Sequence, residues 1–244
     1  MKYRETLYAN YHTTQSGRAA LTDARSLFDR EKWRFEKEII PLIDLPKTAR
    51  ILDIGCGSGS FLKALSDNGY EQFTGIDLSE EQVRLAHELG VKEVQQGDLV
   101  AFLESANEKF DLISGLDIIE HFTKNELVEV LKLIRIHLKP EGMALFRTPN
   151  LDAPMSSVYA NGDFTHENYL NASSAQQLML SCGFANVRVV ESNMQIPNAL
   201  KEIFRKVIFA GLKFKFKLTL FATGRSTQNV LISPNIVIIA KNHG

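Results

Sequence analysis

From residue 50 onward, short apolar runs alternate with stretches in which apolar residues recur every three or four positions. The first pattern is typical of buried strands and the second of amphipathic helices. Strands are predicted over the ranges 49–55, 72–78, 91–99, 110–119, 143–150, 184–190 and 229–240. Helices are predicted over 61–68, 79–89 and 125–138. Because strands and helices alternate, the pattern predicts an α/β fold built from βαβα units.

Three helix starts carry the signature of a capping box, in which a hydroxyl and a side chain three residues later satisfy free backbone amides. The three hydroxyl residues are Ser79, Thr123 and Ser173, and each is followed three positions later by Gln or Glu. We therefore expect helices to begin directly after these residues.

Two segments lie outside the alternating pattern. Residues 1–49 form a lead-in that is polar over 1–30 and has the period of a helix over 31–43. Residues 192–228 separate the last two predicted strands by more than a hairpin loop requires. The predicted organisation is a core over 50–191 and 229–244, with a lead-in cap and one insertion.

The insertion is basic and apolar at once, and Glu202 is the one acidic residue between positions 201 and 225. Its basic residues are Lys201, Arg205, Lys206, Lys213, Lys215, Lys217 and Arg225. Such a segment can lie on an anionic membrane surface. Alternatively, it is a helix that covers the core, with lysine stems over apolar surface. Nucleic-acid binding ranks third, because these residues make a small footprint.

Composition narrows the class of protein. The 244-residue chain has a formal net charge of −1, so no global basic field draws it to nucleic acid. Its two cysteines supply no disulfide framework, and its N-terminus lacks the apolar run of a secretion signal. We expect a cytoplasmic protein without a transmembrane helix and without a nucleic-acid partner; the sequence leaves the oligomeric state open.

A glycine-rich loop, with Gly55, Gly57 and Gly59, follows the first predicted strand. Glycines let the backbone approach a ligand closely and let the next helix offer it its N-terminus. A dinucleotide fingerprint would place the third glycine at position 60, where this chain has Ser60. The spacing therefore favours a ligand without a pyrophosphate. A nicotinamide dehydrogenase and a tight turn without a ligand are the alternatives.

Acidic residues end three further strands, at Asp77, Asp98 and Asp117. The carboxyl ends of parallel strands form the edge at which open α/β sheets bind ligands. Asp77 comes about 20 residues after the loop, where a carboxylate can accept hydrogen bonds from both hydroxyls of a ribose. This spacing fits an adenosine.

With the motifs LDIGCGSG, GIDLS, GDL and FDLISGLDIIEHF, residues 50–150 resemble the core of class I S-adenosylmethionine-dependent methyltransferases. The resemblance implies a Rossmann-like, seven-stranded sheet whose final antiparallel strand is inserted beside the sixth. It places Asp53 and the glycines along the methionine and ribose, Asp77 on the ribose hydroxyls, and Asp98 beside the adenine. The full cofactor-binding set that we predict is Asp53, Gly55, Cys56, Gly57, Gly59, Asp77, Leu78, Asp98, Leu99 and Leu116.

A narrower resemblance extends beyond this core. The runs 147–150, 162–167 and 173–184, the last ending in Cys182, Gly183 and Phe184, resemble methyltransferases of bacterial surface-polysaccharide synthesis. This resemblance implies transfer of a methyl group to a sugar hydroxyl of a nucleotide sugar or a lipid-linked glycan. A quinone-like phenol is the alternative acceptor, since the EH pair after the fourth strand also occurs in enzymes of that kind. A non-catalytic module that binds S-adenosylmethionine is the second alternative.

A hydroxyl acceptor needs a base, and two histidines are candidates. His121 follows the fourth strand at the predicted mouth of the site, and His166 lies in a polar loop. Asp163 and Glu167 could orient His166 or bind substrate hydroxyls. The structural alternatives are that His121 packs against or caps a helix and that His166 bonds only loop backbone. No cluster with the spacing of metal ligands is predicted, although Asp163, His166 and Glu167 leave a metal site open.

Overall fold

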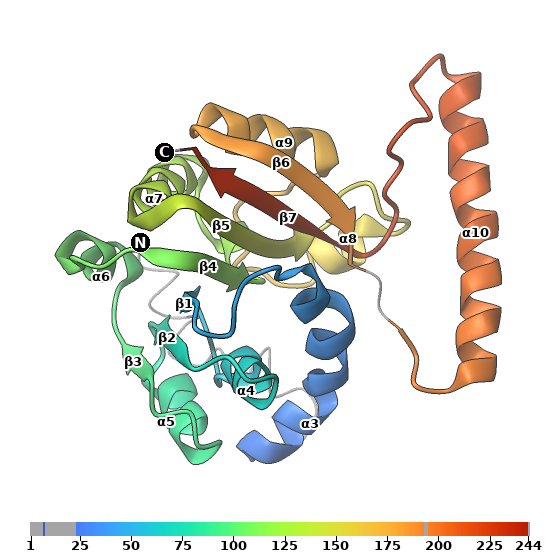
Figure 1. Cartoon of the computed structure of the whole chain (residues 1–244). Helices are drawn as coiled ribbons and strands as arrows, with labels where there is room; N and C mark the ends of the chain where they lie inside the picture. The colour runs from blue at the N-terminus through green and yellow to red at the C-terminus, as the bar shows by residue number, and fades with distance from the viewer. Residues whose placement is uncertain (1–6, 8–22, 193–194, 244) are drawn as a thin grey trace.

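The computed structural model describes residue 7, residues 23–192 and residues 195–243, so most of the first half of the predicted lead-in lies outside the described residues. The described residues form a seven-stranded sheet in the order β3-β2-β1-β4-β5-β7-β6 (Figure 1). Strands β1 to β5 pair in parallel, and β7 runs antiparallel between β5 and β6. The predicted fold class is confirmed.

The strands are β1 (Arg50–Ile54), β2 (Gln72–Asp77), β3 (Val94–Gln96), β4 (Phe110–Leu116), β5 (Leu138–Pro149), β6 (Phe184–Glu191) and β7 (Asn235–Asn242). The helices are α3 (Ala24–Arg34), α4 (Ser60–Asp67), α5 (Glu80–Glu88), α6 (Leu99–Ser105), α7 (Lys124–His137), α8 (Ser156–Ala160), α9 (Ala172–Ser181) and α10 (Ala199–Ala222). A π-helical turn (Phe35–Ile39) and a 3-10 turn (Ile40–Leu42) continue α3, and a second 3-10 turn (Ile119–His121) follows β4.

The sheet has apolar packing on both faces, which explains the continuous apolar runs of its central strands. One core contains Phe28 of α3 and Leu62 of α4 against Leu112 of the sheet. The opposite core contains Leu131 of α7 and Met179 of α9. Helices α3, α4 and α5 thus cover one face and α6, α7 and α9 the other (Figure 1).

Two of the three predicted helix starts are observed. Ser79 accepts a hydrogen bond from the Gln82 amide at the start of α5, and Thr123 forms a complete capping box at the start of α7. The third prediction, Ser173, was wrong. Asn171 caps α9 by accepting a hydrogen bond from the Ser174 amide, because its side chain, two residues before Ser173, already satisfies the free amides of the helix start.

The insertion forms α10, a helix of 24 residues that stands away from the sheet (Figure 1). No residue of α10 is buried. The alternative that this segment covers the core is therefore wrong. None of the helices among the described residues is both long enough and apolar enough to cross a bilayer.

Candidate active site

A cavity of about 900 Å³ opens at the carboxyl ends of the parallel strands. Its walls come from the loop after β1, the ends of β2 and β4, the start of α6 and the helix α3. Predicted residues in its lining are Gly55, Cys56, Gly57, Asp77, Leu78, Asp98, Leu99, Leu116 and His121. Its size falls in the usual range for small-molecule sites, roughly 300–1,000 Å³.

The three glycines of the loop all have positive φ, but their surroundings differ. A Cβ on Gly55 would lie 2.7 Å from Ile118, and one on Gly59 would lie 2.9 Å from Ala86 of α5. These two glycines permit close packing. A Cβ on Gly57 would meet only the Gln82 side chain, at 3.7 Å, and would therefore project into the cavity.

Asp77 organises the loop that faces it. Its carboxylate accepts hydrogen bonds from the Gly57 amide at 2.8 Å and from the Ser79 amide at 2.9 Å. Burial raises the pKa of Asp77, and the two amide hydrogen bonds oppose this effect. The neighbouring Cys56 is buried, and burial raises the pKa of its thiol.

Asp53 is placed differently from the other predicted cofactor residues. It is buried, accepts a hydrogen bond from the Ser114 hydroxyl at 2.7 Å and does not line the cavity. Burial raises its pKa to about 7, and the charge of Asp77 adds to the effect. Contact of Asp53 with a cofactor therefore stays a prediction.

The far wall of the cavity contains the predicted adenine-side residues. Asp98 caps α6 by accepting a hydrogen bond from the Ala101 amide at 3.0 Å, and Leu99 follows it. Leu116 ends β4 on the same side of the cavity.

His121 lines the cavity and is held by two polar groups behind it. The Thr165 hydroxyl donates to Asp163 Oδ1 at 2.6 Å and lies 2.9 Å from His121 Nδ1. Since that hydroxyl has one proton and gives it to the carboxylate, His121 Nδ1 must be the donor to Thr165. The proton therefore sits on Nδ1, and Nε2 carries the lone pair. Burial lowers the pKa of His121 to about 4, and nearby His166 contributes to the shift.

His166 lies behind His121 rather than on the cavity wall. The two rings contact edge to face, with centroids 4.8 Å apart. His166 Nδ1 donates to the Ala160 carbonyl at 2.6 Å, the loop-backbone contact considered for it. Asp163, expected to orient His166 or to bind substrate hydroxyls, holds His121 through Thr165. The Glu167 amide donates to the Glu120 carbonyl, and this bond fixes the loop against the turn after β4.

Sequence spacing missed Glu120 as a member of this group. Ligand atoms of Glu120, His121 and His166 all lie within 4.8 Å of one another, so the three residues could hold a metal ion. Glu120 accepts a hydrogen bond from the Thr148 hydroxyl at 3.1 Å, and burial raises its pKa well above the usual range. A metal ion bound there would have to displace the proton that a raised pKa favours, because a carboxyl group ligates a metal in its deprotonated form.

The structure adds further residues that the sequence did not indicate. Leu27, Arg30 and Glu31 of α3 line the cavity, so part of the predicted lead-in contributes to the site. Arg147 of β5 binds both carboxylate oxygens of Asp117 at the same edge. The EH pair and the Arg147 run were visible as motifs, but no local pattern links α3 to the site.

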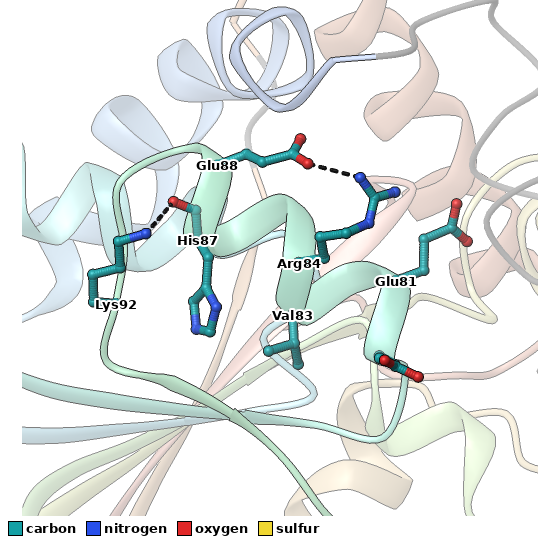
Figure 2. Close-up of a pocket in the computed structure, with 7 residues that line it drawn as sticks. Glu81, Val83, Arg84, His87, Glu88 and Lys92 are labelled. Carbon is teal, nitrogen blue, oxygen red and sulfur yellow. Dashed lines mark hydrogen bonds and ion pairs between the residues drawn. The ribbon is translucent and has the colours of Figure 1, made fainter.

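A second hollow lies along the outer side of α5 (Figure 2). It is lined by charged surface residues, among which Arg84 pairs with Glu88 at 2.7 Å. His87 is held by the Val94 carbonyl at 2.9 Å. This hollow contains none of the predicted site residues, so we assign the site to the larger cavity.

A sheet of this strand order, with a glycine loop and an acid after β2 facing one cavity, defines the class I S-adenosylmethionine-dependent methyltransferase fold. A family model described as a methyltransferase domain matches residues 23–189. The chain belongs to this methyltransferase family, which confirms the predicted enzyme class and S-adenosylmethionine as its cofactor. The cavity fits that cofactor, because Gly57 leaves space beside the Asp77 carboxylate that any side chain would fill.

Individual relatives differ in what they act on. A ubiquinone biosynthesis O-methyltransferase from Rickettsia conorii is 29% identical over 62% of this chain and 52% of its own length. A tRNA U34 carboxymethyltransferase from Aeromonas salmonicida is 25% identical over 68% of this chain and 53% of its own. The chain thus spans about half the length of these curated relatives. A crystal structure of a SAM-dependent methyltransferase from Archaeoglobus fulgidus aligns with TM-score 0.64 and 22% identity, covering 88% of this chain and 94% of that one.

Proposed function

We propose that this methyltransferase transfers a methyl group to a hydroxyl oxygen and that His121 is the general base. The observation that carries the proposal is the hydrogen-bond series Asp163–Thr165–His121, which fixes the orientation and tautomer of a histidine ring that lines the cavity. S-adenosylmethionine, when bound, supplies an electrophilic methyl group on a sulfonium. The protein aligns the acceptor, and His121 Nε2 takes the hydroxyl proton.

Each residue of the hydrogen-bond series Asp163–Thr165–His121 has a defined role. Asp163 fixes the Thr165 hydroxyl, and Thr165 fixes the tautomer and orientation of the His121 ring. When Nε2 gains a proton, the imidazolium lies close to the negative charge of Asp163, which raises the pKa of His121. The cost of charging a buried ring is thereby reduced during the transfer.

The acceptor that suits this base best is a quinone-like phenol. A base whose pKa is about 4 takes a proton most readily from an acidic hydroxyl, and a phenol has a pKa of about 10. A sugar hydroxyl is a weaker acid. The similarity to a ubiquinone biosynthesis O-methyltransferase supports the phenol.

A sugar hydroxyl of a lipid-linked or nucleotide-linked glycan is the second candidate, supported by the resemblance of Arg147–Asn150 and Gly162–Glu167 to surface-polysaccharide methyltransferases. A quinone-like phenol and a lipid-linked glycan are both lipid-borne, and either of them favours action at the cytoplasmic face of a membrane.

The experiment measures transfer of labelled methyl from S-adenosylmethionine to a catechol-type phenol and to a lipid-linked glycan. His121→Ala should lower kcat by roughly 10²–10⁴ with cofactor affinity nearly unchanged, because a base acts in the transition state. His166→Ala is the matched control and should retain most of the activity. Wild-type kcat should fall at low pH around a midpoint near 4, where His121 takes up its proton, rather than near 6.5.

Three results would contradict the proposal. Full activity in His121→Ala would remove the base, and a larger loss in His166→Ala would transfer the role to that residue. Loss of activity on dialysis against EDTA, restored by a divalent cation, would assign Glu120, His121 and His166 to a metal site instead.

A further inference from the structure

An ion pair joins helix α10 to the body of the protein, because Glu191 of β6 binds Lys213 at 3.0 Å. In the segment that leads into the helix, the Ile196 amide donates to Glu202 at 3.0 Å. Half-buried residues recur along the Lys213 side of the helix every three or four positions and form an inner stripe: Glu202, Arg205, Phe209, Lys213, Phe216 and Leu220. At 100° per residue, this spacing keeps them on one side of the helix.

The opposite side carries a second, apolar stripe. Its residues are spaced three, four or seven positions apart and constitute the outer stripe: Leu200, Phe204, Val207, Phe214, Leu218 and Phe221. Their exposed fractions lie between 51% and 79%, so nothing in the described chain covers them. From Leu200 to Phe221 the outer stripe extends about 30 Å. An exposed apolar surface of this length marks an interaction site.

Exposed lysines border the outer stripe on both edges. Helical spacing places Lys206 and Lys217 along one edge and Lys201 and Lys215 along the other. The helix has six basic residues and one acidic residue, so it carries a net charge of +5 in a chain whose net charge is −1. The acidic residue, Glu202, belongs to the inner stripe and binds Arg205. The exposed side of α10 is therefore apolar along its centre and positive along both edges.

We propose that the outer stripe of α10 binds the surface of an anionic membrane, with the helix lying in the plane of the interface. Phenylalanine and leucine enter the boundary between headgroups and acyl chains, and the bordering lysines reach lipid phosphates. The inner stripe keeps the enzyme attached on the aqueous side. No described helix can cross a bilayer, so an in-plane helix is the geometry that buries this stripe in lipid.

A second copy of the chain is the competing occupant. Spacings of three and four also suit the pairing of two helices. Pairing through the outer stripe, however, would bring the bordering lysines of both helices together, and neither edge offers an acidic residue to receive them. Charge complementarity therefore favours anionic lipid. The inference that the membrane presents the methyl acceptor to the cavity rests on the proposed function. The inference that α10 binds lipid does not.

The test is cosedimentation of the full chain with phosphatidylcholine vesicles, with and without phosphatidylglycerol. Binding should be at least about tenfold stronger to the anionic vesicles and should weaken as salt rises. Phe204→Ser with Phe214→Ser should reduce it at least about tenfold. The matched control on the inner stripe, Phe209→Ser with Phe216→Ser, should bind as the wild-type chain does. A calorimetric titration with S-adenosylmethionine checks that each variant is folded.

Equal binding to neutral and anionic vesicles, or binding to neither, overturns the proposal. Analytical sedimentation can also overturn it. If the wild-type chain sediments as a dimer and the outer-stripe variant as a monomer, the stripe binds a second copy of the chain. Vesicle binding in a chain that methylates neither tested acceptor leaves the membrane inference standing and overturns only the proposed function.

Discussion

Gly57→Val tests whether the loop after β1 holds the cofactor. Gly57 has φ +54°, a conformation that a β-branched residue adopts only under strain. The cost of a left-handed residue is about 1–2 kcal/mol and is larger for valine. For a chain of this size each kcal/mol corresponds to about 2–4 °C in Tm, so a cost of about 1–2 kcal/mol lowers Tm by roughly 2–8 °C and valine lowers it by more. The variant should still remain folded.

The effect on cofactor binding should be far larger than the effect on stability. The Cβ would project into the cavity beside the amide that donates to Asp77, so the new methyl groups would occupy the space of the ligand. We expect no measurable S-adenosylmethionine binding in a calorimetric titration and no rise in Tm on addition of the cofactor.

Gly69→Val is the matched control. Gly69 also has a positive φ, of +84°, but a Cβ there meets nothing within 4 Å and the residue does not line the cavity. This variant should show a similar fall in Tm and bind the cofactor normally. Tight cofactor binding by Gly57→Val, or equal loss of binding in both variants, would refute the assignment of the loop.

Three further outcomes follow from named contacts. Asp77→Ala should weaken S-adenosylmethionine binding by about 1.5–3 kcal/mol in a calorimetric titration, the range for a hydrogen bond to a charged group; unchanged affinity in a folded variant would remove Asp77 from the ribose site. Because the pKa of His121 is about 4 in the folded chain and near 6.5 when unfolded, the unfolded state binds the extra proton between these values and stability falls as the pH drops. The difference in unfolding free energy between wild type and His121→Gln should therefore shrink by about 3 kcal/mol from pH 7 to pH 4 in urea titrations, and a constant difference would exclude a buried neutral ring. Asn171→Ala should cost about 1 kcal/mol of stability and Ser173→Ala a few tenths, a ranking that chemical denaturation would reverse if Ser173 were the cap after all.

Local features of this fold could be predicted from the sequence because their causes are local. The period of apolar residues predicted the alternation of strands and helices, and the hydroxyls at Ser79 and Thr123 predicted two helix starts. The prediction at Ser173 failed because Asn171, one half-turn earlier, competes for the same amides. The glycine loop was recognisable because glycine, which has no Cβ, adopts a positive φ without strain.

The catalytic arrangement depends on contacts between distant parts of the chain. His121 and Thr165 are 44 positions apart and meet only because the loop after β5 folds back over the turn after β4. The same packing places His166 behind His121. Asp53 is also buried beside a distant residue, Ser114 of β4, which lies 61 positions further along the chain. Burial also sets the pKa of His121, and a sequence contains no measure of how much water a side chain will lose.

Helix α10 shows most clearly which properties the sequence determines and which the tertiary structure determines. The sequence by itself determined that this segment is basic and amphipathic, because side-chain chemistry and helical spacing are local properties. It left open whether the apolar residues cover the core or face outward. Tertiary structure decided this through the contact of Lys213 with Glu191, which fixes the inner stripe toward the body and leaves the outer stripe exposed. A helix has two sides, and only the rest of the fold determines which of them is covered.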